Sequence, residues 1–336
     1  MSKKLVVGVC TFNVEETIGE TLKTVLNQTV KPDLFVICDK SRDKTPELLE
    51  AFKERADFEV QILKQKGVGV ADALQDIYEY IKSRGGCEVL VVFETDRAFR
   101  ENWLETHLSL RAEFKGCDLV SSVDRPVGTY VARSLKDRLY CWSADMSINW
   151  AALERVGGWD RNMLRSDDWD LHIRLGTCGI TPVVTSKHLH WIISEKHNQL
   201  TLEKMKKRDS SLFFLSKYGF WYLIFHPAHF VSDLFSILFL VIVPILFPLS
   251  LFLMNLKFII SNLILIAIML LAYYIYSVSN NIPYRIALKK WVLYGISIPY
   301  AIKRLIFRKN EWNLKGFVRK YDWNLESYRN DSIKKQ

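Results

Sequence analysis

The first half of the chain alternates short apolar runs with amphipathic segments, and this alternation restricts the fold more than any other feature of the sequence. The apolar runs LVVGVC, LFVICD, VQIL and VLVVF are separated by segments with helical periodicity, such as ETIGETLKTVLNQ and VADALQDIYEYIKS. Strands that alternate with helices form a parallel sheet, because each helix returns the chain to the same edge of the sheet. Residues 4–184 therefore predict an α/β fold, with helices on both faces of a mostly parallel sheet.

Polar residues directly follow several of these apolar runs. In a sheet of this kind, ligands bind beyond the carboxyl ends of the strands, so these residues are candidates for a binding site. Thr11 and Asn13 after the first run could hold a nucleobase or a ribose, and Asp39 after the second run could accept hydrogen bonds from either. Glu15 begins a helix, where an acidic side chain also favours the helix dipole, and this structural explanation is as good as a functional one.

A glycine-containing turn with basic side chains, KQKGVGVADAL, precedes the third amphipathic segment. Lys66 and Gly67 in this turn would lie at a helix N-terminus, which is a suitable position for contacts with a phosphate. A plain tight turn explains the glycines at least as well, because the pattern GxG alone is common and the phosphate-binding pattern GxxxxGK[ST] does not occur. The turn is therefore a weaker candidate than the strand ends.

The segment Glu94-Thr95-Asp96 follows the most apolar run of this region. Two carboxylates at this spacing, at the end of a strand, can share one divalent cation, and carboxylate oxygens suit Mg²⁺ or Mn²⁺ better than zinc. Such a cation could bridge two phosphates and neutralise a leaving group. The alternative is a solvated acidic turn, but the position after a buried strand favours the metal site.

Three carboxylates lie within four residues in RSDDWDLHIRLG, which has the periodicity of an amphipathic helix that starts near residue 166. On such a helix Asp167, Asp170 and Arg174 lie on one face, whereas Asp168 points to another side. Acids in the first turn each stabilise the helix dipole by about 0.3–1 kcal/mol, but for that purpose any one of them would suffice. The three acids therefore need not share one function, and we expect Asp170 to pair with Arg174.

Two runs without any charged residue, 234–254 and 258–279, mark an abrupt change of composition in the second half of the chain. Each has the length that a helix needs to cross about 30 Å of hydrocarbon, so we expect a transmembrane hairpin. Many basic residues follow the second run, and this distribution places both ends of the hairpin in the cytoplasm. The chain is thus predicted to be an integral membrane protein, with its α/β domain and its C-terminus on the cytoplasmic side.

The predicted division of the chain is a catalytic domain at 1–205, interfacial amphipathic helices at 206–232, a transmembrane hairpin at 233–280 and a membrane-associated basic and aromatic region at 281–336. A third span at 291–307 is the alternative, and it would move the basic tail across the membrane. The formal net charge of +9 arises largely beside the predicted spans, where a polybasic segment binds anionic lipid at about 1 kcal/mol per residue. No nucleic-acid-binding motif occurs, so we expect membrane lipids rather than nucleic acid as partners.

Four elements of the sequence, taken in order, resemble the inverting family 2 glycosyltransferases of the GT-A fold. CTFNVEE is similar to the family's PTYNEE-like strand end, and ICDKSRDKT is similar to its VDDGSTDGT-like segment. Glu94-Thr95-Asp96 is similar to its DxD motif, and GGWD followed by DDWDL is similar to its GG(F/W)D and ED(x)DL elements. The resemblance implies a GT-A catalytic domain, Rossmann-like with helices on both faces of its sheet, over about the first two hundred residues.

The resemblance also implies roles for individual residues. Asp168 would be the general base with Asp167 beside it, and Asp96 would bind the metal with Glu94 beside it. His190 could be a third metal ligand, although a core or surface histidine explains it equally well. Cys10 replaces the family's proline, and this departure, with Glu94 in place of the first aspartate of DxD, leaves the nucleobase and the sugar open. The candidates for nucleotide-sugar binding are Thr11, Asn13, Glu15, Asp39, Lys66, Gly67 and Thr95.

The predicted function is transfer of one sugar from a nucleotide-diphosphate sugar to a membrane-associated acceptor. Apolar spans after the catalytic domain look like those of family members that work on lipid-linked acceptors, and the QxxRW motif of the processive synthases does not occur. Two acceptors remain open. A polyprenyl phosphate is already ionised and needs no strong base, whereas a hydroxyl of a lipid-linked saccharide must lose a proton. The element DDWD in the position of the base favours the hydroxyl acceptor.

Overall fold

The computed structural model describes residues 3–123, 128–132, 145–163, 167–180, 182–186 and 189–193, and single positions at 260, 263, 264, 267 and 271. The chain divides into two compact units, one of which contains residues 1–199 and the other residues 200–316. Within the part of the chain that the structure describes, no helix is long and apolar enough to cross a membrane. The predicted segments 206–232, 233–280, 281–336 and 291–307 lie outside the described residues, apart from the five single positions, and stay predictions.

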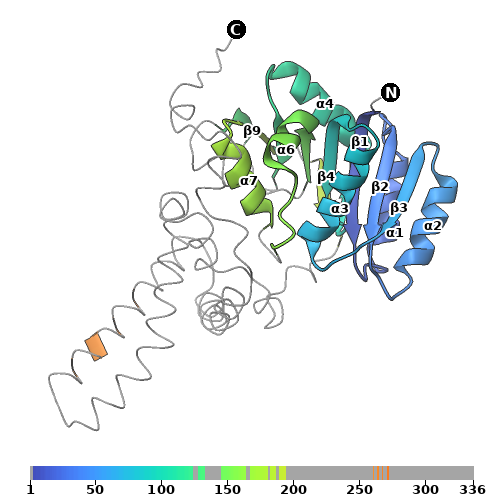
Figure 1. Ribbon diagram of the computed structural model, residues 1–336, viewed down its shortest axis with the longest axis horizontal. Helices are drawn as coiled ribbons and strands as arrows, with labels where there is room; N and C mark the ends of the chain where they lie inside the picture. The colour runs from blue at the N-terminus through green and yellow to red at the C-terminus, as the bar shows by residue number, and fades with distance from the viewer. Residues whose placement is uncertain are drawn as a thin grey trace. The chain divides into compact units, whose positions relative to one another are not determined.

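An eight-stranded mixed sheet forms the centre of the first unit (Figure 1), with the strand order β3-β2-β1-β4-β8-β6-β9-β7. Its strands are β1 (Lys3–Thr11), β2 (Leu34–Asp39), β3 (Glu59–Lys64), β4 (Cys87–Phe93), β6 (Leu119–Ser122), β7 (Thr129–Val131), β8 (Asp145–Asn149) and β9 (Pro182–Thr185). β3, β2, β1 and β4 pair in parallel, as the sequence predicts. β8 departs from the prediction, because it lies antiparallel between β4 and β6.

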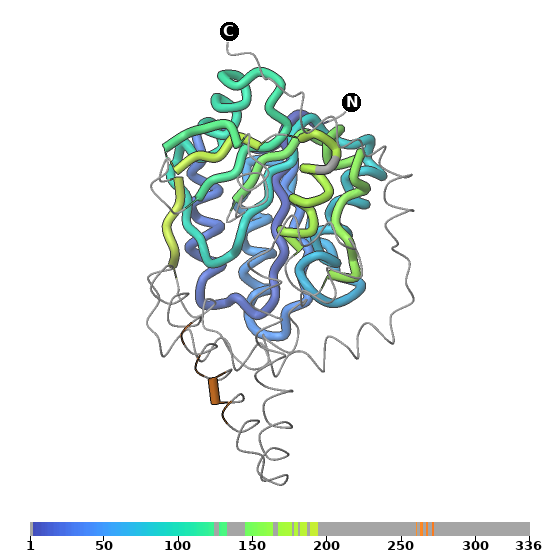
Figure 2. The backbone as a smooth tube through the Cα atoms, turned by 90° about the vertical axis from the view of Figure 1, so that its left-hand side faces the viewer, coloured from blue at the N-terminus to red at the C-terminus, as the bar shows by residue number. Residues whose placement is uncertain are grey.

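Helices cover both faces of the sheet (Figures 1 and 2). They are α1 (Ile18–Leu26), α2 (Thr45–Arg55), α3 (Val70–Ser83), α4 (Trp103–Glu113), α6 (Trp150–Val156) and α7 (Asp167–Thr177). Alternate side chains of each strand point to opposite faces. Val7 and Val9 of β1 therefore join the core with α1, α2 and α4, whereas Gly8 faces Ile77 of α3. The predicted α/β fold with helices on both faces is confirmed.

The strand register aligns the carboxyl ends that carry the predicted site. Thr11 at the end of β1 lies opposite Asp39 at the end of β2, and Asp39 lies opposite Lys64 at the end of β3. β4 is in register with β1, with Gly8 opposite Val92, so the segment after β4 emerges at the same edge. Loops that are far apart in the sequence thus meet at one edge of the sheet.

A separate two-stranded sheet begins directly after the acidic segment that follows β4. It consists of β5 (Arg97–Phe99) and β10 (His190–Ile192), which pair antiparallel with His190 opposite Phe99. The backbone N–H of Ile193 donates to the carbonyl of Asp96 at 2.8 Å. This sheet brings a late segment of the domain next to the residues that follow Asp96, and the sequence pattern did not predict it.

Candidate active site

The loops after β1 and β2 are joined by side-chain hydrogen bonds. The Thr11 hydroxyl donates to Asp39 Oδ1 at 2.6 Å, and the Ser41 hydroxyl donates to the same oxygen at 2.6 Å. The backbone N–H of Asn13 donates to Ser41 Oγ at 2.8 Å. The structure therefore brings together Thr11, Asn13 and Asp39, as expected for a shared site at the ends of β1 and β2.

Asn13 and Glu15, in the loop after β1, form hydrogen bonds with the backbone of the loop after β2. Asn13 Oδ1 accepts from the backbone N–H of Arg42 at 2.8 Å, and Glu15 Oε2 accepts from that of Lys44 at 2.9 Å. Asn13 has φ of 51°, a left-handed conformation that asparagine tolerates better than most residues. Both side chains thus fix the shape of the loop pair, and contacts with a nucleotide stay predictions.

Phe12 is a residue that the sequence reasoning missed. Its side chain is 58% exposed, although it lies between Thr11 and Asn13 at the end of a buried strand. Exposure of a large aromatic ring to water is unfavourable, and such a ring at a binding edge offers a flat surface for stacking. The signal that could have identified it is an aromatic residue in the first strand-end loop.

The turn before α3 is held by acidic side chains of α3. The backbone N–H of Lys66 donates to Asp76 Oδ2 at 2.9 Å, and that of Gly67 donates to Asp72 Oδ2 at 2.7 Å. A Cβ atom at position 67 would lie 2.5 Å from the Asp72 carboxylate, so glycine is required for this close approach. These two N–H groups are already satisfied without a phosphate, and the predicted phosphate contact is not tested by this arrangement.

Arg161 connects the GGWD segment to the same two carboxylates. Its guanidinium lies 2.7 Å from Asp72, 2.8 Å from Asp76 and 2.8 Å from Glu79. Burial alone would lower the pKa of Arg161, but hydrogen bonds with the three carboxylates outweigh this effect and raise the pKa above its ordinary value. The charge of Arg161 thus offsets the acidic face of α3.

The carboxylates of the segment after β4 lie in different environments. Asp96 has a side chain that is 7% exposed and that of Glu94 is 56% exposed. Arg97 Nη2 lies 3.3 Å from Glu94 Oε2, and Arg97 Nε lies 3.5 Å from Asp96 Oδ1. Between them, Thr95 is fixed through its backbone, because its carbonyl accepts from the Thr21 hydroxyl of α1 at 3.0 Å.

The pKa of Glu94 is raised to about 7. The main cause is a partial loss of water around the carboxylate, and the negative charge of Asp96 and, to the smallest extent, that of Asp168 add to it against the opposing effect of Arg97. Asp168 of α7 therefore acts electrostatically on the segment after β4.

Asp96 and Glu94 fit a divalent cation. Among the described residues, Asp96 Oδ1 is buried and has no hydrogen-bond partner; Arg97 Nε at 3.5 Å partly offsets its charge but leaves the oxygen available to a cation. Carboxylate oxygens are the ligands that Mg²⁺ and Mn²⁺ prefer. Over the described residues no three histidine, cysteine or acidic side chains form a group that could hold a metal.

His190 lies in a buried polar network. Its side chain is 3% exposed, with Nδ1 3.1 Å from Ser122 Oγ and 3.5 Å from Asp145 Oδ2. Burial tends to raise the pKa of Asp145, but hydrogen bonds with His107 and His190 hold it well below its usual range. These contacts fit the alternative of a core histidine, and its service as a third metal ligand stays a prediction.

The three acids of α7 have different surroundings. Asp170 is fully buried and pairs with Arg174, whose Nε and Nη2 lie 2.8 Å from Asp170 Oδ2. Arg174 also donates to the carbonyls of Val156 and Gly158, at 3.0 and 2.6 Å. The predicted pairing of Asp170 with Arg174 is confirmed, and this pair anchors α7 to the segment that follows α6.

Asp167 and Asp168 are half-buried and lie at the first turn of α7. The pKa of Cys10, at the end of β1, is raised to about 12, chiefly by burial and next by the negative charge of Asp167. Asp167 therefore acts on the end of β1, as Asp168 acts on Glu94. The sequence places these neighbouring acids on different faces of the helix, and in the folded domain each contributes negative charge near one of the strand ends.

The fold and these strand-end residues define an α/β domain of GT-A type, with acidic groups on two facing elements. The sequence of residues 6–183 matches the family described as Glycosyl transferase family 2. The chain therefore belongs to glycosyl transferase family 2. No curated protein matches the chain.

Several solved structures are similar in fold. The mannosyltransferase PcManGT from Pyrobaculum calidifontis, in complex with GDP-Man and Mn²⁺, has a TM-score of 0.53 and 16% identity, over 91% of this chain and 87% of that chain. S. aureus TarS has a TM-score of 0.45 and 17% identity, over 60% of this chain. Glucosyl-3-phosphoglycerate synthase from Mycobacterium tuberculosis, in complex with Mn²⁺, UDP and glucosyl-3-phosphoglycerate, has a TM-score of 0.44 and 16% identity, over 64% of this chain and 79% of that chain. This chain spans 38% of the length of TarS.

Proposed function

We propose that this protein is a membrane-bound inverting glycosyltransferase. It moves one sugar from a nucleotide-diphosphate sugar to a hydroxyl group of a lipid-linked saccharide. The observation that carries the proposal is the buried carboxylate of Asp96 just after β4, at the same edge of the sheet as Thr11 and Asp39, because this position joins a candidate cation site to the candidate donor loops. Family membership supports the reaction type.

The donor nucleotide binds at the ends of β1 and β2. Asp39 can accept hydrogen bonds from a base or a ribose, and it is held in place by Thr11 at 2.6 Å. Phe12 offers its exposed ring for stacking with the base, since every nucleobase has a flat π-face. The complex of PcManGT with GDP-Man supports a nucleotide sugar as donor.

Asp96 and Glu94 hold a divalent cation, Mg²⁺ or Mn²⁺. When bound, it neutralises the negative charge that develops on the leaving diphosphate. The buried Asp96 Oδ1 without a hydrogen-bond partner among the described residues supports this assignment, as do the Mn²⁺ ions of two proteins with similar folds. Arg97 holds Glu94 through its Nη2 at 3.3 Å.

Asp168 accepts the proton of the attacking hydroxyl. Inversion requires the acceptor to attack from the side opposite the leaving diphosphate, with a base on that side. Asp170 cannot serve, because it is fully buried against Arg174. Asp167 acts on the end of β1, and we assign it a supporting role beside Asp168.

The second half of the chain anchors the protein in the membrane, with the catalytic domain on the cytoplasmic side. The runs 234–254 and 258–279 are apolar over the length of a span. Described positions of the second run are helical, and their apolar side chains are exposed: Ile260, Leu263, Ile264 and Leu271. Apolar helix surface of this kind needs a cover, which lipid would supply.

Sugar transfer measured with two different acceptors distinguishes the proposed reaction from the synthesis of polyprenyl-phosphate sugars. Purified full-length enzyme is incubated with Mn²⁺ and a panel of UDP-, GDP- and dTDP-sugars, with either polyprenyl phosphate or a lipid-linked saccharide as acceptor. We expect transfer to the lipid-linked saccharide, and no transfer in the Asp168→Asn variant. Transfer to bare polyprenyl phosphate would contradict the hydroxyl acceptor.

A further inference from the structure

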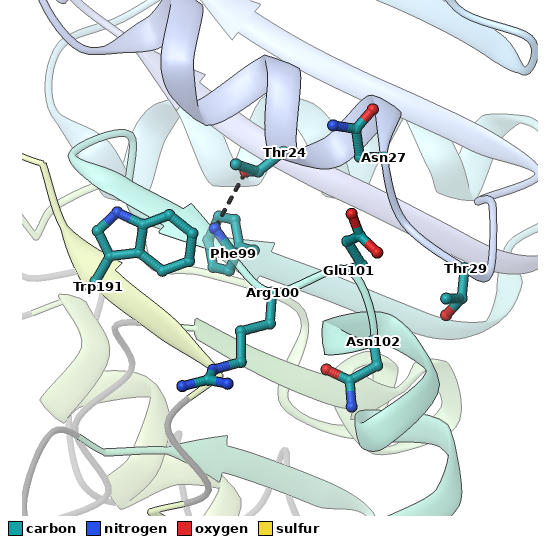
Figure 3. Close-up of a pocket in the computed structure, with 8 residues that line it drawn as sticks. All are labelled: Thr24, Asn27, Thr29, Phe99, Arg100, Glu101, Asn102 and Trp191. Carbon is teal, nitrogen blue, oxygen red and sulfur yellow. Dashed lines mark hydrogen bonds between the residues drawn. The ribbon is translucent and has the colours of Figure 1, made fainter.

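A cavity of about 620 Å³ lies beside the two-stranded sheet, between the end of α1, the segment that joins β5 to α4, and β10 (Figure 3). The polar and aromatic residues that line it include Asn27, Thr29, Arg100, Glu101, Asn102 and Trp191. None of them belongs to the donor loops or to the acidic elements described above. The cavity therefore has no role in the function proposed so far.

We propose that this cavity binds a neutral sugar unit of the acceptor saccharide. The inference rests on the proposed function, because it supplies a second point of contact for an acceptor that is longer than one sugar. Beyond the proposed function, it specifies the place where the acceptor binds and the class of ligand that binds there.

The side chains of the cavity match the two kinds of surface that a sugar presents. A pyranose has an apolar face of C–H groups, and the indole of Trp191, which is 47% exposed, offers a flat apolar surface to cover it. Its hydroxyl groups need both donors and acceptors, and the amides of Asn27 and Asn102 supply both. Figure 3 shows Trp191 on one side of the cavity, with Asn27, Glu101 and Asn102 on the other.

The charges of the cavity favour a neutral ligand. Arg100 contributes one positive charge and its neighbour Glu101 one negative charge. A phosphate or an acidic sugar would meet the unfavourable Glu101 carboxylate as well as the Arg100 guanidinium. Both charged groups can instead hydrogen-bond with hydroxyl groups, since carboxylates accept and guanidinium groups donate.

Four hydrogen bonds hold the backbone around the cavity in place. The Phe99 N–H donates to Thr24 Oγ1 at 3.1 Å, and the Thr29 N–H donates to the Glu101 carbonyl at 2.8 Å. Arg100 is fixed twice, because its N–H donates to the Leu189 carbonyl at 2.8 Å and its carbonyl accepts from Gln28 Nε2 at 2.8 Å. A preformed site of this kind loses less entropy when a ligand binds.

The cavity also lies within reach of the candidate reaction centre. β5 begins directly after Asp96, and Phe99 is three residues further on, about 10 Å along an extended strand. β10 returns to the same place, where the Ile193 N–H donates to the Asp96 carbonyl at 2.8 Å. A saccharide of several units could therefore extend from the cavity toward the acidic elements.

Binding of simple disaccharides tests the proposal. The full-length chain is studied by saturation-transfer NMR with disaccharides of glucose, galactose, mannose and N-acetylglucosamine, one at a time. We expect at least one to bind the wild-type chain, and Trp191→Ala to weaken this binding about tenfold or more, since 1.4 kcal/mol of lost contact corresponds to a factor of ten. Asn27→Ala, an exposed substitution, should weaken it severalfold, and it decides the matter if Trp191→Ala does not fold.

The matched control is Phe12→Ala, which removes an exposed aromatic ring from the donor loops and should leave disaccharide binding unchanged. The proposal is overturned if no disaccharide binds, if binding survives the substitutions in the cavity, or if Phe12→Ala abolishes it. Turnover of nucleotide sugars is measured on the same preparations. An enzyme that turns over donor but binds no disaccharide here refutes the cavity alone, whereas absence of any turnover refutes the proposed function.

Discussion

At the scale of single residues, the acids of α7 differ in role. Asp170 is structural, whereas Asp167 and Asp168 are candidates for catalysis. Asp170 is fully buried and its carboxylate is paired with Arg174, whereas Asp168 is half-buried and acts on Glu94. The sequence predicted the pairing through the spacing of four residues. It could not predict which strand end each of the other two acids affects, because that depends on how the helix docks.

Asp170→Asn should destabilise the domain far more than Asp168→Asn. Removal of one charge from a buried ion pair leaves the other uncompensated and typically costs about 3–5 kcal/mol. A change at half-buried Asp168 should alter the free energy of unfolding by less than about 1 kcal/mol. Thermal unfolding of the two full-length variants measures the difference, and equal losses of Tm would contradict this division.

His172 should make the domain less stable in mild acid. It is buried, and burial lowers its pKa from 6.5 to about 4, so the unfolded chain binds its proton more readily than the folded chain does. The free energy of unfolding is therefore highest above pH 6.5 and falls as the pH decreases from 6.5 to 4, by up to about 3 kcal/mol. Unfolding measured at pH 7.5 and at pH 5 should show this loss.

The control for this effect is His172→Leu, which cannot be protonated. His172 Nε2 has no hydrogen-bond partner among the described residues, so an apolar side chain of similar size removes no such contact. The variant should lose distinctly less stability between pH 7.5 and pH 5 than the wild-type chain. An unchanged loss would assign the pH dependence to other groups.

At the scale of elements, the packing of α3 against the segment after α6 depends on glycine. Gly158 has φ of 79°, and an added Cβ would overlap Gln75 Oε1 and lie 2.8 Å from Tyr78 Cδ1. Gly158→Ala should therefore destabilise the domain by about 2 kcal/mol or more, because backbone strain and overlap act together.

Gly19→Ala is the matched substitution in α1. An added Cβ there meets nothing within 4 Å, and alanine favours helix over glycine by up to about 1 kcal/mol. This variant should thus be as stable as the wild-type chain or slightly more stable. Denaturant unfolding of the pair checks both signs, and a harmless Gly158→Ala would refute the proposed close packing.

Elements with long, regular patterns were predictable, and short elements were not. The parallel strands β1 to β4 have continuous apolar runs, and α1 and α3 have clear helical periodicity. β5 and β10 have three residues each, too few for a pattern, and they pair across about ninety positions of the sequence. The sequence therefore indicated the strand-end residues, but not the sheet that encloses the cavity beside Trp191.

At the scale of the whole molecule, the sequence divides into a first half that carries the candidate site residues and a second half that contains two long uncharged runs. The lipid-linked acceptor and the nucleotide donor that we propose come from different phases, so an enzyme that joins them would need both a polar and an apolar surface. The hydrogen bonds of Asn13 and Glu15 with the loop after β2 could not be predicted, because they connect residues that are about thirty positions apart. Only the folded sheet brings these residues together.

Comparison of Asp168→Asn with the wild-type enzyme tests the central claim most directly. Loss of a general base should lower the rate of sugar transfer by about 10²–10⁴-fold. Mn²⁺-dependent binding of the nucleotide sugar, measured by calorimetry on the same variant, should stay nearly unchanged, because the candidate donor and cation residues remain. Undiminished transfer by Asp168→Asn would contradict the assignment of Asp168 as the base.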